Sequence, residues 1–85
     1  MKLLWEDRAW NDYLDWKDED KKTLKRINKL IKDIQRSPFE GIGKPEPLVE
    51  NLSGWCSRRI DDKNRIVYFV ENDIVHVVAC KGHYI

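Results

Sequence analysis

Three short apolar segments near the C-terminus decide the fold: WCSRRI at residues 55–60, RIVYFV at 65–70 and IVHVVA at 74–79. Each is rich in β-branched and aromatic residues, which favour strands. The polar stretches DDKN at 61–64 and END at 71–73 separate them, as is typical of tight turns. The pattern predicts an antiparallel meander, one face of which packs on helices while the other meets solvent or a ligand.

Residues 18–36 are predicted to form a long amphipathic helix, with an acidic start at 18–20 and an end at Ser37-Pro38. Its apolar residues recur at helical spacing and are expected to bury against the sheet: Leu24, Ile27, Leu30, Ile31 and Ile34. The opposite face forms a basic ridge of Lys22, Lys25, Lys29, Lys32 and Arg36. This ridge is either an ordinary solvated face or a surface that tracks the phosphates of RNA.

The N-terminal part is expected to form a short strand over residues 2–5 and a helix over residues 6–17. Apolar side chains recur along this helix at Ala9, Trp10, Tyr13, Leu14 and Trp16. We interpret this aromatic stripe as core packing. The alternative is that its surplus aromatic area forms a subunit interface.

A loop rich in glycine and proline, residues 39–51, follows the long helix. Its Gly41-Ile42-Gly43-Lys44 run superficially resembles a phosphate-binding loop. No serine or threonine follows the lysine and no strand precedes the run, so we reject a nucleotide-binding P-loop. In Pro45-Glu46-Pro47 the prolines restrict the glutamate to extended geometry, which suits either a pre-organised carboxylate or a stiff linker. Residues 48–53 are expected to add an edge strand.

Length and composition predict one small domain over residues 1–85, with a formal net charge of +1. Near-neutral overall charge means that any nucleic-acid binding depends on how the charge is distributed. We expect a cytoplasmic protein, since no signal peptide and no run long enough to span a bilayer is recognisable. Cys56 and Cys80 have no CxxC or histidine-rich neighbourhood, so we expect reduced core thiols and no metal site.

The turn near residues 72–73 leaves two strand registers open, because a slip of one residue moves every side chain to the other face. A two-residue turn leaves Arg65 and His83 on opposite faces, whereas a longer or bulged arrangement puts them together. The same choice decides whether Arg58 or Arg59 accompanies Arg65. If these residues form a site, we expect the longer or bulged arrangement.

A series of motifs runs through the chain: PFEG at 38–41, GKPEPL at 43–48, NLSG at 51–54, SRRI at 57–60, RIVY at 65–68 and HY at 83–84. In this series the chain resembles the YoeB toxins of the RelE/ParE superfamily. It departs from the family pattern at Val49, where lysine is common, at Gly82, where an aromatic residue is familiar, and at Ile85, which follows the tyrosine. The resemblance implies an α+β, microbial-ribonuclease-like fold with two helices on a twisted antiparallel sheet.

The resemblance also implies an activity, that of a ribosome-dependent messenger-RNA endonuclease. Matched by motif, the family's proposed catalytic glutamate falls on Glu46, its phosphate-binding arginines on Arg59 and Arg65, and its terminal pair on His83-Tyr84. The catalytic candidates are therefore Glu46, Arg65, His83 and Tyr84, and the substrate-binding candidates are Arg59, Lys44 and Arg58. The basic ridge is the candidate ribosome-binding surface.

The chemistry of these residues agrees with RNA cleavage through the 2′-hydroxyl. That reaction needs a base for the hydroxyl, positive charge for the transition state and an acid for the 5′-oxygen. Glu46 could be the base, Arg59 and Arg65 the charge clamp and His83 the acid, while Tyr84 stacks on a base or orients the phosphate. Neither a metal nor a cofactor is required, and the products would carry a 2′,3′-cyclic or 3′-phosphate and a 5′-hydroxyl.

Partners also follow from the resemblance: a YefM-type antitoxin, messenger RNA, the ribosome at its 30S A site, and operator DNA only for the toxin–antitoxin complex. A homodimer stays open, and no membrane is expected. Two alternatives remain. One is a ParE-like toxin that acts on DNA gyrase, against which the Glu46 and His83-Tyr84 set argues. The other is a non-catalytic module whose basic ridge docks a partner.

Overall fold

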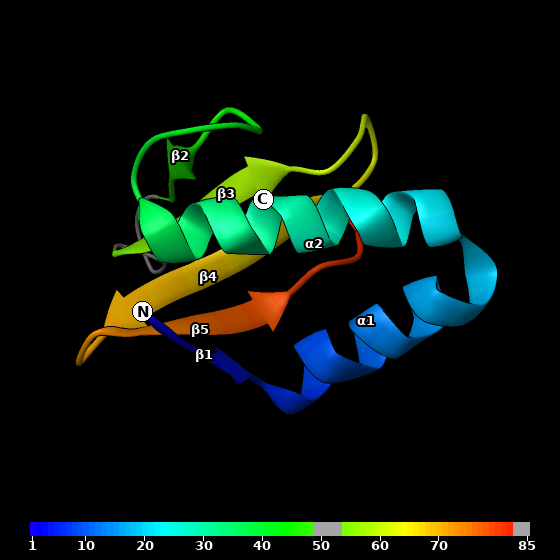
Figure 1. The fold of residues 1–85 in the computed structure, drawn as a ribbon, viewed down its shortest axis with the longest axis horizontal. Helices are drawn as coiled ribbons and strands as arrows, with labels where there is room; N and C mark the ends of the chain where they lie inside the picture. Colours follow the sequence, from blue (N-terminus) through cyan, green and yellow to red (C-terminus); the bar gives the residue numbers. More distant parts are fainter. Residues whose placement is uncertain (49–53, 83–85) are drawn as a thin grey trace.

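The computed structural model describes residues 1–48 and 54–82. Its elements are β1 (Lys2–Trp5), α1 (Asp7–Glu19), α2 (Lys21–Arg36), β2 (Glu46–Pro47), β3 (Trp55–Arg59), β4 (Arg65–Glu71) and β5 (Ile74–Ala79). The strands form one sheet in the order β1-β5-β4-β3-β2. Both helices pack on the same face of this sheet, and α2 runs across it (Figure 1). The architecture is therefore the expected α+β one, with a helical layer on a sheet.

The sheet is mixed rather than wholly antiparallel. The meander β3-β4-β5 and the edge strand β2 are antiparallel, whereas β1 runs parallel to β5. Most of the chain separates β1 from β5, so no tight turn forces the two strands to run in opposite directions. The expected edge strand begins earlier than predicted, at Glu46, and residues 49–53 lie outside the described part of the chain.

The boundary between the helices is set by Asp20. Its side chain accepts hydrogen bonds from the backbone N–H groups of Lys22 and Thr23, both at 3.1 Å, and from the Thr23 hydroxyl at 2.8 Å. The Thr23 hydroxyl bond is the main cause that lowers the pKa of Asp20. This cap starts α2 at Lys21, so the acidic residues before it extend α1 to Glu19 instead of opening the second helix.

Apolar side chains from both helices and the sheet form one core, and α2 contributes Ile27, Leu30, Ile31 and Ile34. The predicted apolar face of α2 is confirmed, with Leu24 only partly buried at its margin. The aromatic stripe of α1 divides: Ala9 and Trp16 are buried, whereas Trp10 is 45% exposed. Both cysteines are free and buried. Neither described helix is long and apolar enough to cross a membrane.

The β4–β5 connection contains a tight turn and, farther along, a bulge. Asn72 and Asp73 have φ of 55° and 62°, as in a two-residue hairpin turn, and Glu71 pairs with Ile74. The register then shifts between Val67 and Tyr68. As a result, the Arg65 N–H donates to the Gly82 carbonyl at 3.0 Å. The turn is the shorter alternative, but the bulge supplies the shifted register near Arg65.

Candidate functional site

The face of the sheet opposite the helices, here called the helix-free face, carries Glu46, Ser57, Arg59 and Arg65. Arg59 pairs directly with Arg65 across β3 and β4, and Glu46 pairs with Ser57 across β2 and β3. Paired residues project from the same side of a sheet, and alternate residues along a strand share a face. Strand pairing thus brings the glutamate and both arginines, which are remote in sequence, to one surface.

Glu46 and Arg65 form the centre of this group. The Arg65 Nη2 atom lies 3.4 Å from Glu46 Oε2, and Arg65 Nε donates to the Ser57 hydroxyl at 2.9 Å. The Arg65 side chain is 14% exposed and that of Glu46 is 67% exposed. Although it is near the carboxylate, Arg65 Nη2 is buried without a hydrogen-bond partner among residues 1–48 and 54–82. A buried donor left in this state is unfavourable, so Arg65 has unused capacity to bind an acceptor oxygen.

The backbone at Glu46 is held in an extended edge strand that pairs with β3. Glu46 and Pro47 form the edge strand β2, and the next residue, Leu48, donates its N–H to the Trp55 carbonyl at 2.8 Å. A proline lacks an N–H donor and is therefore tolerated at a sheet edge. The Pro45-Glu46-Pro47 run consequently does more than link two segments, because it places a carboxylate beside Arg65.

Arg59 is the second arginine of the helix-free face and is less tightly held. Its guanidinium donates to the Asp62 carboxylate, and its side chain is 40% exposed. Its backbone is fixed by an N–H bond to the Gly43 carbonyl at 2.6 Å and by a bond from Arg26 to its own carbonyl at 3.1 Å. A phosphate at Arg59 would compete with the carboxylate of Asp62.

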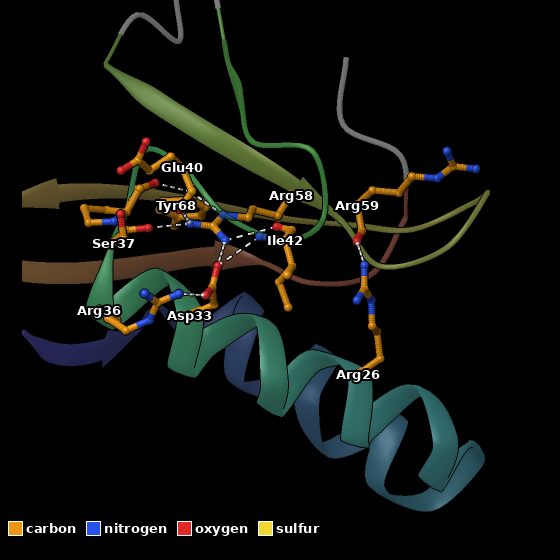
Figure 2. Close-up of polar contacts among 10 residues, drawn as sticks. Arg26, Asp33, Arg36, Ser37, Glu40, Ile42, Arg58, Arg59 and Tyr68 are labelled. Carbon is orange, nitrogen blue, oxygen red and sulfur yellow. Dashed lines mark hydrogen bonds and ion pairs between the residues drawn. The ribbon is translucent and has the colours of Figure 1, made fainter.

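Arg58, predicted to bind substrate, instead lies in the protein interior with 0% exposure. Its guanidinium donates to Asp33 of α2 and to the Tyr68 hydroxyl at 3.2 Å. It also donates to three loop carbonyls, those of Ser37, Glu40 and Ile42. Figure 2 shows Arg59 pointing away from this network. Strand alternation sends the two neighbouring arginines to opposite faces, so Arg58 is a structural residue and the substrate-binding prediction for it is wrong.

The Gly41-Ile42-Gly43 run wraps around the Arg58–Asp33 pair. The Ile42 N–H donates to Asp33 at 3.0 Å, and the Ile42 carbonyl accepts from Arg58 at 3.0 Å. A Cβ atom at Gly41 would lie 2.0 Å from Asp33 Oδ2, and φ there is +138°. The glycines thus permit a close backbone approach. They anchor the loop that leads to Glu46.

The carboxylate of Asp33 is strongly stabilised in its ionised form. Hydrogen bonds from Arg58, and then from Arg36, lower the pKa of Asp33 from 3.8 to about 2. This carboxylate joins the C-terminal end of α2 to β3 and to the loop before Glu46. The charge network on the helix side therefore supports the position of the site without contacting it.

The remaining candidates are placed as follows. Lys44 is exposed and lies two residues before Glu46, with φ of 50°. The basic ridge is exposed along its whole length, and Arg36 at its end pairs with Asp33. His83 and Tyr84 lie outside the described residues. Within residues 1–48 and 54–82, no group of three or more His, Cys, Asp or Glu side chains could hold a metal ion.

Two features were not predicted from the sequence. One is the interior role of Arg58, for which strand alternation showed only that one of two adjacent arginines must face inward. The other is a row of aromatic rings on the helix-free face, formed by Trp55, Phe69 and His76. Each lies in a predicted strand, but their alignment depends on a register that the sequence left open.

Comparison with known proteins identifies the family. Residues 5–84 match the family model described as a YoeB-like toxin of a bacterial type II toxin–antitoxin system. The chain is 55% identical to toxin YoeB of Escherichia coli strain K12 over 84 residues, covering 99% of this chain and 100% of that protein.

Solved structures show the same similarity. A YoeB/ParE toxin from Agrobacterium tumefaciens has a TM-score of 0.96 and 42% identity, covering 99% of this chain and 100% of that one. YoeB from Staphylococcus aureus, described as a dimer, has a TM-score of 0.91 and 42% identity, covering 99% and 98%. The same toxin in a heterotetrameric YoeB–YefM complex has a TM-score of 0.90 and 42% identity over the same shares. This chain therefore belongs to the YoeB-like toxins of bacterial type II toxin–antitoxin systems.

Proposed function

We propose that the protein is a metal-independent endoribonuclease that cleaves messenger RNA on the ribosome and thereby inhibits translation in the cytoplasm. The observation that carries this proposal is the Glu46 carboxylate beside Arg65, with Arg59 paired to Arg65 on the same face. A base next to concentrated positive charge is what attack of a 2′-hydroxyl on the neighbouring phosphate requires.

In this reaction Glu46 removes the proton of the 2′-hydroxyl. The 2′-oxygen attacks the adjacent phosphorus, and Arg65 and Arg59 stabilise the negative charge of the pentacoordinate transition state. The bond from phosphorus to the 5′-oxygen breaks, and an acid protonates the leaving oxygen. The family resemblance assigns the acid to His83 and a supporting role to Tyr84. The products are a 2′,3′-cyclic phosphate, which water can open to a 3′-phosphate, and a 5′-hydroxyl.

The test is message cleavage in a reconstituted translation reaction. Glu46→Gln should slow cleavage by roughly 100- to 10,000-fold, as expected for loss of a general base. Glu71→Gln is the matched control, because Glu71 is exposed and lies at the opposite end of β4 from Arg65. Undiminished cleavage by Glu46→Gln would overturn the assignment. Incubating the wild type with DNA gyrase in parallel tests the gyrase-directed alternative.

We also propose that a YefM-type antitoxin is the partner, as the Staphylococcus aureus relative forms a complex with YefM. Acidic antitoxin side chains would mask Arg59 and Arg65 on the helix-free face. In the cell, the toxin would meet operator DNA only within that complex. On the ribosome, Lys44 and the basic ridge supply positive charge for RNA at the A site.

A homodimer is proposed through the aromatic cluster of Trp5, Trp10 and Tyr13. The Trp10 and Tyr13 rings are stacked with centroids 5.7 Å apart, and Trp10 is 45% exposed. The cluster borders a surface cavity of about 470 Å³ between β1, α1 and α2. An exposed aromatic patch of this kind suits burial against a second copy. Sedimentation should show a dimer for the wild type and a monomer for Trp10→Glu; identical masses would contradict the proposal.

A further inference from the structure

A row of aligned rings crosses the helix-free face. Trp55 of β3 stacks on Phe69 of β4 with centroids 5.5 Å apart and an angle of 14° between the ring planes. Phe69 in turn stacks on His76 of β5 at 4.4 Å and 6°. Trp55 is the strand partner of Phe69, and Phe69 is the strand partner of His76. The strand register therefore produces a continuous aromatic row.

The row is separate from the hydrophobic core. The core on the helix side is built from Tyr68, Val75 and Val77 together with the helices, and it includes none of the three ring residues. All three are only partly buried. Cross-strand aromatic pairs do stabilise a sheet. Packing alone, however, does not call for three nearly parallel rings on a surface that no described helix covers.

The row lies next to the proposed cleavage site. Trp55 lies two residues before Ser57, the strand partner of Glu46, and both project from the helix-free face. Two residues of strand correspond to about 7 Å. This separation is comparable to the step between neighbouring nucleotides of an extended single strand. A strand whose phosphate lies at Arg65 therefore places a neighbouring base at the aromatic row.

We propose that the aromatic row forms a stacking subsite for the nucleobase adjacent to the scissile phosphate of single-stranded RNA. The base stacks on the outer face of Trp55, at the end of the row nearer Glu46, because the Phe69 ring is already stacked between Trp55 and His76. The inference rests on the proposed function, because it takes Glu46 and Arg65 as the reacting centre. Aromatic side chains accept any base through its π-face, with preferences that follow stacking strength. The subsite thus favours purines over pyrimidines without reading hydrogen-bonding edges.

The probe is a hexanucleotide RNA with 2′-O-methyl riboses, which lacks the attacking hydroxyl, labelled for fluorescence anisotropy. It is prepared with adenines, with uracils, and with adenines of which the central two are replaced by abasic sites. Base stacking is worth about 5- to 140-fold in affinity. The wild type should bind the adenine probe most tightly and lose about fivefold or more with the abasic probe.

Trp55→Leu removes the ring on which the base stacks, and Phe69→Leu removes the ring that supports Trp55; both variants keep apolar side chains. They should bind all three probes with nearly equal, weakened affinity. Phe39→Leu is the matched control, because Phe39 is 66% exposed in the loop after α2 and should bind as the wild type does. Arg65→Gln should weaken binding to every probe by a similar factor, since it removes a phosphate contact.

Equal binding of adenine and abasic probes by the wild type would overturn the subsite, even if the leucine variants proved unstable. The subsite is also overturned if the leucine variants keep the full difference in affinity between the adenine and abasic probes. It is overturned as well if these variants lose binding to an antitoxin peptide but not to RNA. Failure of the proposed function would give a different result. The wild-type protein would then bind the adenine probe more tightly than the abasic probe but would not cleave translated message.

Discussion

At the scale of single residues, Arg58 and Arg59 show how strand alternation decides a role. The Ser57-Arg58-Arg59 motif pointed to positive charge at a substrate, and the structure turns Arg59 and Arg58 to opposite faces. Arg58 gives all its nitrogens to Asp33, Tyr68 and loop carbonyls. A buried charged group is stable only when its donors have hydrogen-bond partners. The sequence alone did not indicate which groups would pair with Arg58.

The ionisation of Asp33 makes the stability of the fold depend on pH. Its pKa falls from 3.8 to about 2 through hydrogen bonds from Arg58 and Arg36. A lowered pKa in the folded state adds stability that is complete above about pH 4 and is lost as the pH falls towards 2. In urea titrations, the free energy of unfolding of the wild type should therefore exceed that of Asp33→Asn at neutral pH, and the gap should narrow across this range.

Arg36→Leu is the control for this titration. It removes the secondary hydrogen bond and keeps the Arg58 bond, so its stability should decline over a narrower pH range than in the wild type. A gap between wild type and Asp33→Asn that stays constant from pH 5 to about 2 would show that the carboxylate is not coupled to folding.

Substitution of Gly41 tests whether the loop must pack closely against Asp33. A Cβ there would lie 2.0 Å from Asp33 Oδ2, whereas a Cβ at Gly54 would meet no atom of the described residues within 4 Å. Both glycines have positive φ, of +138° and +93°. Gly54→Ala should therefore cost only the backbone strain, about 1–2 kcal/mol. Gly41→Ala should cost clearly more and should also slow RNA cleavage, because the displaced loop carries Glu46. Equal thermal shifts for the two variants would contradict this account.

At the scale of elements, α2 was the most predictable part of the chain. Its apolar periodicity and the Ser37-Pro38 stop gave the buried face and the C-terminal end at Arg36. The start was misplaced because three acidic residues in succession offered alternative caps, and only Asp20 makes the hydrogen bonds. Local sequence patterns predict that a helix forms. Its ends depend on which of several suitable side chains makes the capping hydrogen bonds.

The basic ridge of α2 is expected to contribute charge to ribosome binding. Lys25 and Lys29 are exposed and lie on the face of α2 opposite its buried residues. Lys25→Glu with Lys29→Glu should leave the melting temperature nearly unchanged and weaken ribosome association, most visibly at low salt. The double variant Lys25→Gln with Lys29→Gln, which removes charge without reversing it, should have a smaller effect. Unchanged association across a salt titration would remove the ridge from ribosome binding.

The meander illustrates what the sequence leaves undetermined. Its strands and turns follow from composition, and the Asn72-Asp73 turn adopts the shorter, two-residue geometry of the two that the sequence left open. The bulge beside Val67 has no signal in the chain, yet it sets the register that joins Arg65 to Gly82. The parallel placement of β1 is equally non-local. Features fixed by contacts between distant segments were thus the ones that sequence reasoning could not resolve.

At the scale of the whole molecule, one face of the sheet carries the core and the other carries the candidate site. The helices and the Arg58 network stabilise one face, and the other collects Glu46, Arg59, Arg65 and the aromatic row. The motif series predicted that Glu46 and Arg65 belong to one site, and in the structure Arg65 Nη2 lies 3.4 Å from Glu46 Oε2. It could not identify the aromatic row, because rings on three strands become one surface only after the register is set.

This division predicts where an antitoxin binds. An acidic segment over the helix-free face would pair with Arg59 and Arg65 and exclude RNA at the same time. By mass action, an antitoxin at 100 times its Kd should stabilise the fold by about 2.7 kcal/mol. Arg59→Glu with Arg65→Glu should abolish most of the rise in melting temperature, whereas Lys25→Glu with Lys29→Glu should preserve it. The reverse result would place the antitoxin on α2, where it would leave Glu46 open, and inhibition would then have to act by blocking ribosome binding.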